Sequence, residues 1–374
     1  MSKRKKRKLK KLPLLILILI IAGVGYYFYK KSDGNILEKA KEKIKDIVPP
    51  VVEKKVQIVN LDSNSRPIAV MINNVGAAWK YQAGICDAYM VYSLLVEGGI
   101  TREMALFKDA REDTKIMSIR SARHYYIDYV LENDAIYTHW GWSPYAESDI
   151  KKLKINNING LYYEGSYFLR DKELRSQKVS LEHTGYITME SINKANEKFK
   201  YRTTTDTSVL LNYKPESVDY SKVEDVQNAD HIEIKYSAYY TAKYDYDEKT
   251  KTYKKMQNKV VMEDYNDTCD LTYKNIITYQ IPYSEIAGDK KGRLNATTTG
   301  EGKGYLITEG KAIPITWQKT SRESKTIYKL LDGTDLIVND GLTAIELQPK
   351  NQKLIIEAKP EEESTTTTTT KKEE

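Results

Sequence analysis

The eight residues PIAVMINN, numbers 67–74, decide the fold, because an unbroken apolar run there stops at two asparagines. A short run of this kind predicts a strand buried on both faces. Two more apolar runs follow at 88–96 and 104–107, and a further strand is predicted at 135–138. Three stretches are predicted to be helices, at 121–131, 144–153 and 188–199. Residues 61–202 are therefore predicted to form a layered sheet-and-helix α/β domain.

A different pattern begins after a polar, weakly patterned connection at residues 203–230. From Ile232 to Tyr240 apolar residues alternate with polar ones, which is typical of a half-buried strand. Asp332-Gly333 and Asp340-Gly341 mark tight turns, and strands are predicted around them (305–308, 313–319, 327–331, 335–338 and 344–347). Residues 231–350 are predicted to be a β-rich antiparallel domain, so the fold class is α+β.

The two ends of the chain predict where the protein lies. Residues 12–29 carry no charge and, at about 1.5 Å per residue, are long enough for a transmembrane helix. A basic tail at 1–11 should stay in the cytoplasm, which places the body outside the cell on a charged stalk at 30–60. A cleaved signal peptide has the same charge order, but this apolar run is longer than usual. Residues 351–374, with six consecutive threonines, are predicted to be disordered.

The net charge of +7 does not indicate nucleic-acid binding. Residues 1–11 hold eight lysines or arginines and no acid, which leaves 51 basic against 52 acidic residues in the rest. The body is nearly neutral, so no nucleic-acid partner is predicted.

Two polar clusters in the first region are candidate binding residues. Glu97, Thr101 and Arg102 surround a Gly-Gly turn after a buried strand, although a tight hairpin with a structural Glu–Arg pair is the more ordinary interpretation. Ser121 is predicted to cap the helix that follows, and with Arg120 and Arg123 beside it that helix end is a candidate anion site. The alternative is that both arginines pair with internal acids such as Glu97 or Asp128.

A third cluster comprises His139, Trp140 and Trp142 at the end of a predicted strand. Such residues suit stacking on a sugar ring, but a satisfied histidine in a packed aromatic turn is the more ordinary interpretation. His139, His183 and Glu97 contain the residue types of a metal site, yet no ligand spacing supports one, so neither a metal nor a cofactor is predicted.

The two cysteines, Cys86 and Cys269, lie in different regions. They could form one disulfide outside the cell. We favour the alternative that they are two unrelated buried residues.

These motifs together resemble the YerB-like family, envelope lipoproteins of Gram-positive bacteria built on domains of unknown function. The resemblance covers about 66–348 and rests on ordered segments in both regions (66–74, 87–102, 119–123, 292–293, 302–305, 310–311, 317–319, 332–333 and 339–341). It implies an α+β body on the outer face of the membrane, without established activity or catalytic residues. Family members are lipid-anchored through a cysteine, whereas here a transmembrane helix is expected instead.

The sequence favours a membrane-anchored extracytoplasmic binding or scaffolding module, since it carries no catalytic signature. Another envelope protein or a cell-wall polymer is the expected partner. The alternative is an envelope hydrolase or transferase acting on an anionic or glycan substrate. Its arginines (Arg102, Arg120 and Arg123) would clamp the anion, and His139 or Glu97 would be the base.

Overall fold

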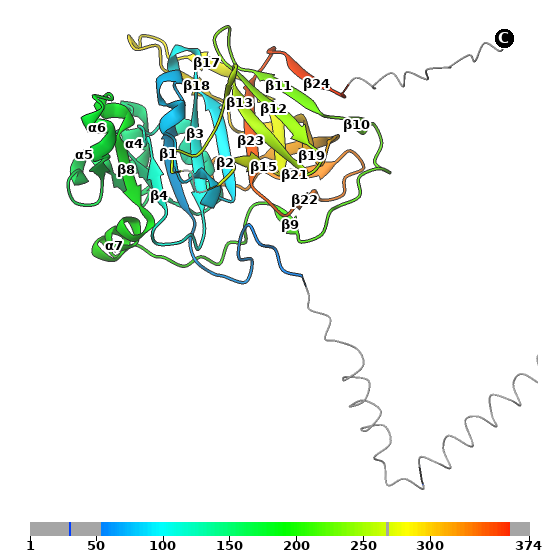
Figure 1. Ribbon diagram of the computed structural model, residues 1–374, viewed down its shortest axis with the longest axis horizontal. Helices are drawn as coiled ribbons and strands as arrows, with labels where there is room; N and C mark the ends of the chain where they lie inside the picture. The colour runs from blue at the N-terminus through cyan, green and yellow to red at the C-terminus, as the bar shows by residue number, and fades with distance from the viewer. Residues whose placement is uncertain (1–29, 31–53, 267–268, 360–374) are drawn as a thin grey trace, which may run out of the picture. The chain divides into compact units, whose positions relative to one another are not determined.

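The computed structural model describes residue 30 and residues 54–266 and 269–359 (Figure 1). From Lys55 onward the described residues form one compact unit. No helix among the described residues is long and apolar enough to cross a membrane. The predicted basic tail (1–11) and transmembrane segment (12–29) lie outside the described residues, as do most of the predicted stalk and C-terminal tail. The prediction of disorder from residue 351 onward is wrong at Leu354–Glu357, which form a strand.

One large sheet passes through the middle of this unit and takes strands from both sequence regions (Figure 1). β21 (Ile327–Leu330) pairs with β20, and the others follow the order β10 (Gln227–Asn228), β20 (Lys311–Lys319), β19 (Gly300–Thr308), β16 (Asn275–Ile281), β23 (Thr343–Pro349), β2 (Met90–Leu95), β3 (Thr101–Phe107), β1 (Ile68–Asn73), β5 (Ile136–His139) and β6 (Asn157–Asn159).

The position of β23 corrects the prediction of a purely antiparallel second region. β19, β20 and β21 are antiparallel neighbours, as predicted. β23 instead lies between β16 and β2 and runs parallel to both. Parallel neighbours need a long connection, and the chain from β16 to β23 supplies one by way of β19 to β21.

A second sheet packs on one face of the large one and crosses in front of β23 in Figure 1. It consists of β14 (Val260–Val261), β13 (Thr252–Gln257), β12 (Thr241–Asp247), β11 (His231–Lys235) and β24 (Leu354–Glu357), with β15 (Thr272–Tyr273) on β13. Alternate residues of β1 show why its sequence is apolar throughout. Met71 lies in the core on the helix side, while Val70 and Ile72 lie in the core beneath the second sheet.

Short helices and small sheets complete the unit. The 3-10 helices are η1 (Gly76–Tyr81), η2 (Ile85–Asp87), η3 (Glu97–Gly99), η4 (His124–Tyr126) and η5 (Leu181–His183). The α-helices are α3 (Ile127–Glu132), α4 (Pro144–Lys152), α5 (Gly160–Tyr163), α6 (Lys172–Ser176) and α7 (Met189–Phe199). The small sheets are β4 (Lys115–Met117) with β8 (Gly185–Thr188) and β7 (Leu169–Arg170), β17 (Tyr283–Glu285) with β18 (Leu294–Ala296), and β22 (Ile337–Asn339) with β9 (Asn212–Lys214).

The structure corrects the start of the helix predicted at 121–131. The α-helix there begins at Ile127, after η4, and no side chain caps it. Ser121 is not a helix cap, because its hydroxyl donates to the carbonyl of Trp140 at 3.0 Å. The other two helix predictions are confirmed by α4, capped by Ser143, and α7, capped by Thr188.

Candidate functional site

Three parallel strands end together at one edge of the large sheet. β1, β5 and β6 run parallel, so their last residues, Asn73, His139 and Asn159, meet there. β3 is antiparallel to β1 and begins at the same edge, where Arg102 pairs with Asn73. In open α/β sheets this carboxyl edge is the usual place for a ligand.

The segment 118–123 runs across this edge. It brings the predicted cluster at 120–123 next to the clusters at 97–102 and 139–142. Asn73 donates its backbone N–H to the carbonyl of Ser118 at 2.8 Å, and Trp140 donates its own to the carbonyl of Arg120 at 3.0 Å. Backbone hydrogen bonds and register thus bring three separate sequence clusters to one edge. We call Glu97, Arg102, Arg120, Ser121 and Arg123 the arginine edge.

Arg123 and Glu97 form a buried ion pair within the arginine edge. Nε of Arg123 donates to Oε2 of Glu97 at 2.9 Å, and Nη2 contacts Oε1. Burial favours the neutral carboxyl, but the hydrogen bonds and charge of Arg123 outweigh it and lower the pKa of Glu97 to about 2. The predicted internal partner of Arg123 is therefore present. Arg120 pairs instead with Glu182, at 3.0 Å, and Asp128 pairs with Arg322.

Arg102 differs from its two neighbours because it forms no ion pair among the described residues. Its side chain is buried, with 6% of the residue exposed, and Nη1 donates to the carbonyl of Ser121 at 2.5 Å. Burial first and then the charge of Arg123 lower its pKa to about 10, so it stays charged at neutral pH. The three guanidinium groups of the arginine edge therefore have two carboxylates as partners, Glu97 within the edge and Glu182 beside it.

Thr101 and His139 reach this edge of the sheet, but their polar atoms are used inside the protein. Thr101 accepts a hydrogen bond from the amide of Asn74 at 2.8 Å. His139 is fully buried, with Nδ1 at 2.8 Å from the carbonyl of Gly141 and Nε2 at 3.2 Å from Oδ1 of Asn157. Burial lowers the pKa of His139 to about 4, so the ring is neutral near pH 7. It is a packed histidine, and its single N–H donates to one of these two oxygens.

The two tryptophans of the third cluster have different surroundings. The guanidinium of Arg170 lies over the ring of Trp140 at 3.9 Å. A Cβ added at Gly160 would come within 2.5 Å of the indole, so the ring is tightly held. Trp142 packs against His139 and against the exposed ring of Tyr162, with centroids 5.6 and 5.7 Å apart. Of the two, Trp142 lies against a surface ring.

His139, His183 and Glu97 do not form a metal-ligand group among the described residues. Nδ1 of His183 lies 3.1 Å from the amide of Asn73, and Glu97 is engaged by Arg123. The described part of the chain brings another set of potential ligands close together, Cys86, Asp264 and Cys269. Those two cysteines are bonded to each other, and Asp264 accepts from the backbone of Gly84 at 2.6 Å.

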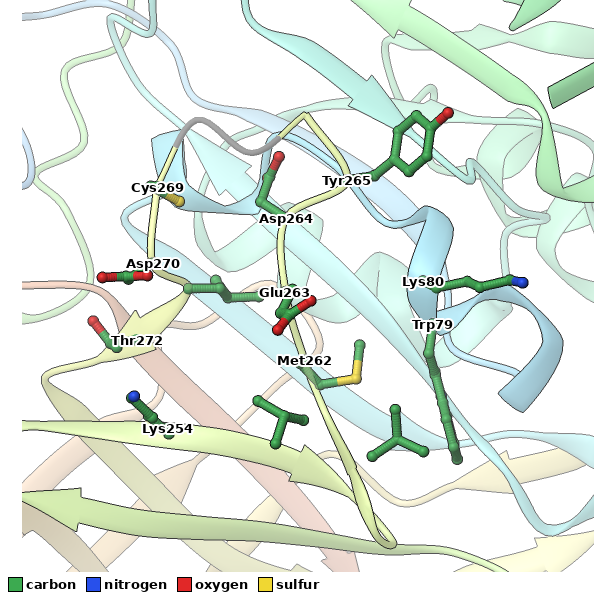
Figure 2. A pocket seen from close by; sticks show the side chains of 13 residues that line it. Trp79, Lys80, Lys254, Met262, Glu263, Asp264, Tyr265, Cys269, Asp270 and Thr272 are labelled. Carbon is green, nitrogen blue, oxygen red and sulfur yellow. The ribbon is translucent and has the colours of Figure 1, made fainter. Parts of the chain in front are cut away.

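The disulfide overturns the expectation that the two cysteines are unrelated. Cys86 of η2 bonds to Cys269 in the loop between β14 and β15, across 183 residues of sequence. Beside it is a cavity of about 600 Å³. Figure 2 shows Trp79 and Met262 towards one end of the cavity and Cys269 with Asp270 towards the other. Only the predicted exposure to an oxidising exterior could have indicated this bond in advance.

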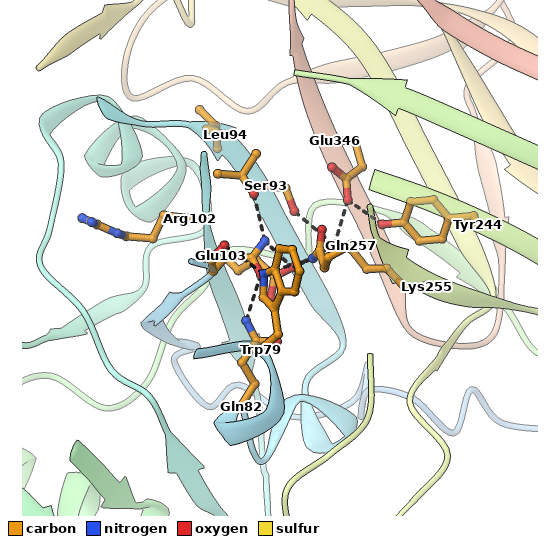
Figure 3. A network of polar contacts seen from close by, with 12 residues as sticks. Trp79, Gln82, Ser93, Leu94, Arg102, Glu103, Tyr244, Lys255, Gln257 and Glu346 are labelled. Atoms are coloured by element: carbon orange, nitrogen blue, oxygen red, sulfur yellow. Dashed lines mark hydrogen bonds and ion pairs between the residues drawn. The ribbon is translucent and has the colours of Figure 1, made fainter. Parts of the chain in front are cut away.

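Sequence reasoning also missed a buried polar network between the two sheets (Figure 3). Lys255 of β13 lies 2.8 Å from Oε1 of Glu103 and 3.0 Å from Oε1 of Glu346. The hydroxyls of Tyr236 and Tyr244 donate to Glu346 at 2.6 and 2.5 Å. Burial opposes the charge on Lys255, but both carboxylates favour it and raise its pKa well above the usual value. Figure 3 shows Arg102 pointing away from this network.

The network lies inside the protein, and the sequence gives only a weak indication of it. Glu103 lies next to Arg102, directly before the apolar run of β3, and a charge is unexpected in a strand buried on both faces. Nothing in the sequence shows that Lys255, more than 150 residues away, is its partner. All three charged groups are almost fully buried, so the network joins the sheets and offers no open surface to a ligand.

The fold and the edge site together define a layered α+β protein with a cluster of arginines at one edge of its large sheet. Two models of one family match the chain: "Protein of unknown function (DUF3048) N-terminal domain" over residues 57–202 and the corresponding C-terminal domain over residues 232–345. The chain belongs to this YerB-like family.

The YerB protein of Bacillus subtilis is similar to this chain in both sequence and structure. "Putative lipoprotein YerB" of Bacillus subtilis is 28% identical over 315 residues, which cover 82% of this chain and 89% of the relative. The crystal structure of YerB protein from Bacillus subtilis is similar with a TM-score of 0.67 and 27% identity, covering 78% of this chain and 94% of the other. The family resemblance predicted from the sequence is confirmed, and the family brings no known activity.

Proposed function

We propose that this chain is an extracytoplasmic envelope protein that binds an anionic group of an envelope partner at the arginine edge. Residues 12–29 would anchor it in the membrane, with residues 1–11 in the cytoplasm. The lipoprotein name of its relative supports an envelope location. The disulfide supports it independently, because such bonds persist in oxidising compartments.

The observation that carries the binding proposal is the charged, buried Arg102 without an ion-pair partner. A guanidinium offers five N–H donors, and the described contacts of Arg102 occupy one of them. With Arg120 partly exposed beside it, a carboxylate or phosphate would supply the missing negative charge. Such groups occur on cell-wall polymers and on acidic protein segments, which are the partners we propose.

The same geometry favours a binding module over the alternative of a hydrolase or transferase. A general base must be free to take a proton near neutral pH. Glu97 has a pKa of about 2 and is held by Arg123. His139 has both ring nitrogens in contact with protein oxygens and no exposed surface. The two residues considered as a base are therefore unsuited to that role.

The binding test is calorimetric titration of the full-length chain with inorganic phosphate at low salt. Arg120→Gln and Arg102→Met should each weaken binding roughly tenfold, since each removes a charge-assisted hydrogen bond. Arg175→Gln, on the exposed side of α6, is the control and should bind as the wild type does. Added salt should weaken binding by screening. Equal affinity of all four proteins would refute the site.

The location has its own test. Protease added to intact cells should remove the body of the protein while residues 1–11 stay protected. Digestion that occurs only after lysis would show that the body is inside the cell.

A further inference from the structure

The outer face of β19, β20 and β21 forms a groove that is separate from the arginine edge. Two adjoining cavities of about 580 and 450 Å³ lie along it, and Lys303 lines both. The first is bordered by β16, β19, β20, the end of β23, β24 and the segment before β10. The second continues over β20 to β21. We call this surface the β19 groove.

Strand register shows which side chains share the face of the β19 groove. Thr278 of β16 pairs with Tyr305 of β19, which pairs with Pro314 of β20. One step along, Lys303 pairs with Thr316, which pairs with Lys329 of β21. Paired residues project from the same side of a sheet. Glu346 of the buried network also pairs with Thr278, so the groove lies on the face that the second sheet covers farther along.

The lining of the groove is polar, and its positive and negative charges cancel. Lys303 and Lys329 are balanced by Glu301 and Asp225, which line the same cavities. The rest of the polar lining is made of amides and hydroxyls, among them Gln227, Gln280, Gln318, Gln348, Thr278 and Thr316. Amides and hydroxyls both donate and accept hydrogen bonds. This lining suits a ligand that also does both, and it does not favour an anion.

Thr278 supplies a second, independent indication of a ligand. Only 1% of the residue is exposed, and its hydroxyl has no hydrogen-bond partner in the protein. Buried polar groups are nearly always satisfied, so an unpaired one in a cavity wall requires an explanation. Its cross-strand neighbour Tyr305 is partly buried and lines the same cavity. A ring and a free hydroxyl side by side are suited to a sugar, which has an apolar face and a polar rim.

We propose that the β19 groove binds an uncharged glycan chain. The ring of Tyr305 would pack on the face of a sugar, and the hydroxyl of Thr278 would form a hydrogen bond with a substituent of the sugar ring. The groove consists of two adjoining cavities, so it is long enough for several consecutive sugars. An acetamido group has one N–H donor and one carbonyl acceptor and can pair with an unpartnered hydroxyl such as that of Thr278, which makes β-1,4-linked N-acetylglucosamine oligomers the most informative probe. The observations that support this site are separate from those at the arginine edge. Either proposal can therefore be wrong while the other is correct.

The experiment is titration calorimetry of the full-length chain, held in a polyoxyethylene detergent that contains no sugar. An N-acetylglucosamine hexamer should bind more tightly than the monomer, and added salt should change its affinity little. Tyr305→Ala should weaken binding roughly tenfold or more. Thr278→Val, which keeps the side-chain shape, should weaken it roughly two- to tenfold.

Tyr239→Ala is the matched control, because Tyr239 is 78% exposed and does not line the groove. It should bind the hexamer as the wild type does. Thermal melting of all variants checks that they are folded. The proposal is overturned if the hexamer does not bind, or if it binds the folded Tyr305→Ala and Thr278→Val variants as tightly as the wild type. Phosphate binding that survives in these variants would belong to the arginine edge.

Discussion

Lys255 lies at the centre of the polar network between the two sheets. It is the cation between Glu103 and Glu346, and all three are nearly inaccessible to water. Lys255→Met should destabilise the protein by about 3–5 kcal/mol, because two buried carboxylates would lose their counter-ion. Urea unfolding followed by circular dichroism measures this loss.

The neighbouring residue provides the control for that prediction. Lys254→Met lies on the same strand but on an exposed side, and should change stability by less than about 0.5 kcal/mol. Adding Glu103→Gln and Glu346→Gln to Lys255→Met should recover part of the loss, since no unpaired charge then remains. Equal stability of the two single variants would show that the network contributes nothing.

His139 makes the stability of the protein depend on pH. Its pKa falls from 6.5 to about 4 on folding, because burial disfavours the charged ring. A lowered folded pKa gives stability that is complete above the unfolded value of 6.5 and is lost as the pH falls towards 4. The loss attributable to His139 should reach about 3 kcal/mol at pH 4. Unfolding curves of wild type and His139→Gln between pH 7 and 4 should converge, and parallel curves would contradict this account.

At the residue scale, the sequence predicts better which residues meet than what they do. Two of its clusters lie at the ends of strands in one sheet, and backbone hydrogen bonds of residues 118–123 hold the other cluster against the same edge. The sequence left two possibilities for Arg123, an anion site or a pair with an internal acid such as Glu97, and the structure contains the pair with Glu97. Thr278 could not have been singled out, since an unpaired hydroxyl is a property of its surroundings and not of its sequence.

Among the elements, β19 is unusual because Gly300, Gly302 and Gly304 share one face. A Cβ at Gly304 would lie 2.4 Å from the carbonyl oxygen of Thr278 and 2.9 Å from Cβ of Tyr279. Gly304→Ala should therefore push β19 away from β16 and destabilise the protein by about 1–3 kcal/mol. Gly76→Ala, whose added Cβ would meet nothing closer than 3.7 Å, is the control. Their melting temperatures distinguish the two cases.

Elements with strong local signals are the ones that the sequence predicts correctly. β1 follows from an unbroken apolar run, and α4 and α7 follow from helical spacing and a capping side chain. The helix at 127–132 starts late because residues 118–123 make backbone bonds to β1 and to the Trp140 turn. Those partners are distant in sequence, so local periodicity contains no sign of them.

On the scale of the whole molecule, the two sequence regions share a sheet because β23 fits between β16 and β2. Pairing of this kind depends on register and burial over more than two hundred residues, which composition does not reveal. The helices α3 to α7 precede residue 203 and the strands of the second sheet follow it, but the large sheet takes strands from both sides of that position.

The disulfide is a second connection between the regions, and its removal tests how much they depend on each other. Cys86 and Cys269 are 183 residues apart, so the bond restricts the unfolded chain strongly. Replacing both by serine should cost about 2–4 kcal/mol. Dithiothreitol should lower the melting temperature of the wild type towards that of the double variant and leave the variant unchanged. If reduction has no effect on the wild type, the shared sheet and the contacts between the two sheets hold the regions together without the bond, which then constrains only the loop beside the 600 Å³ cavity.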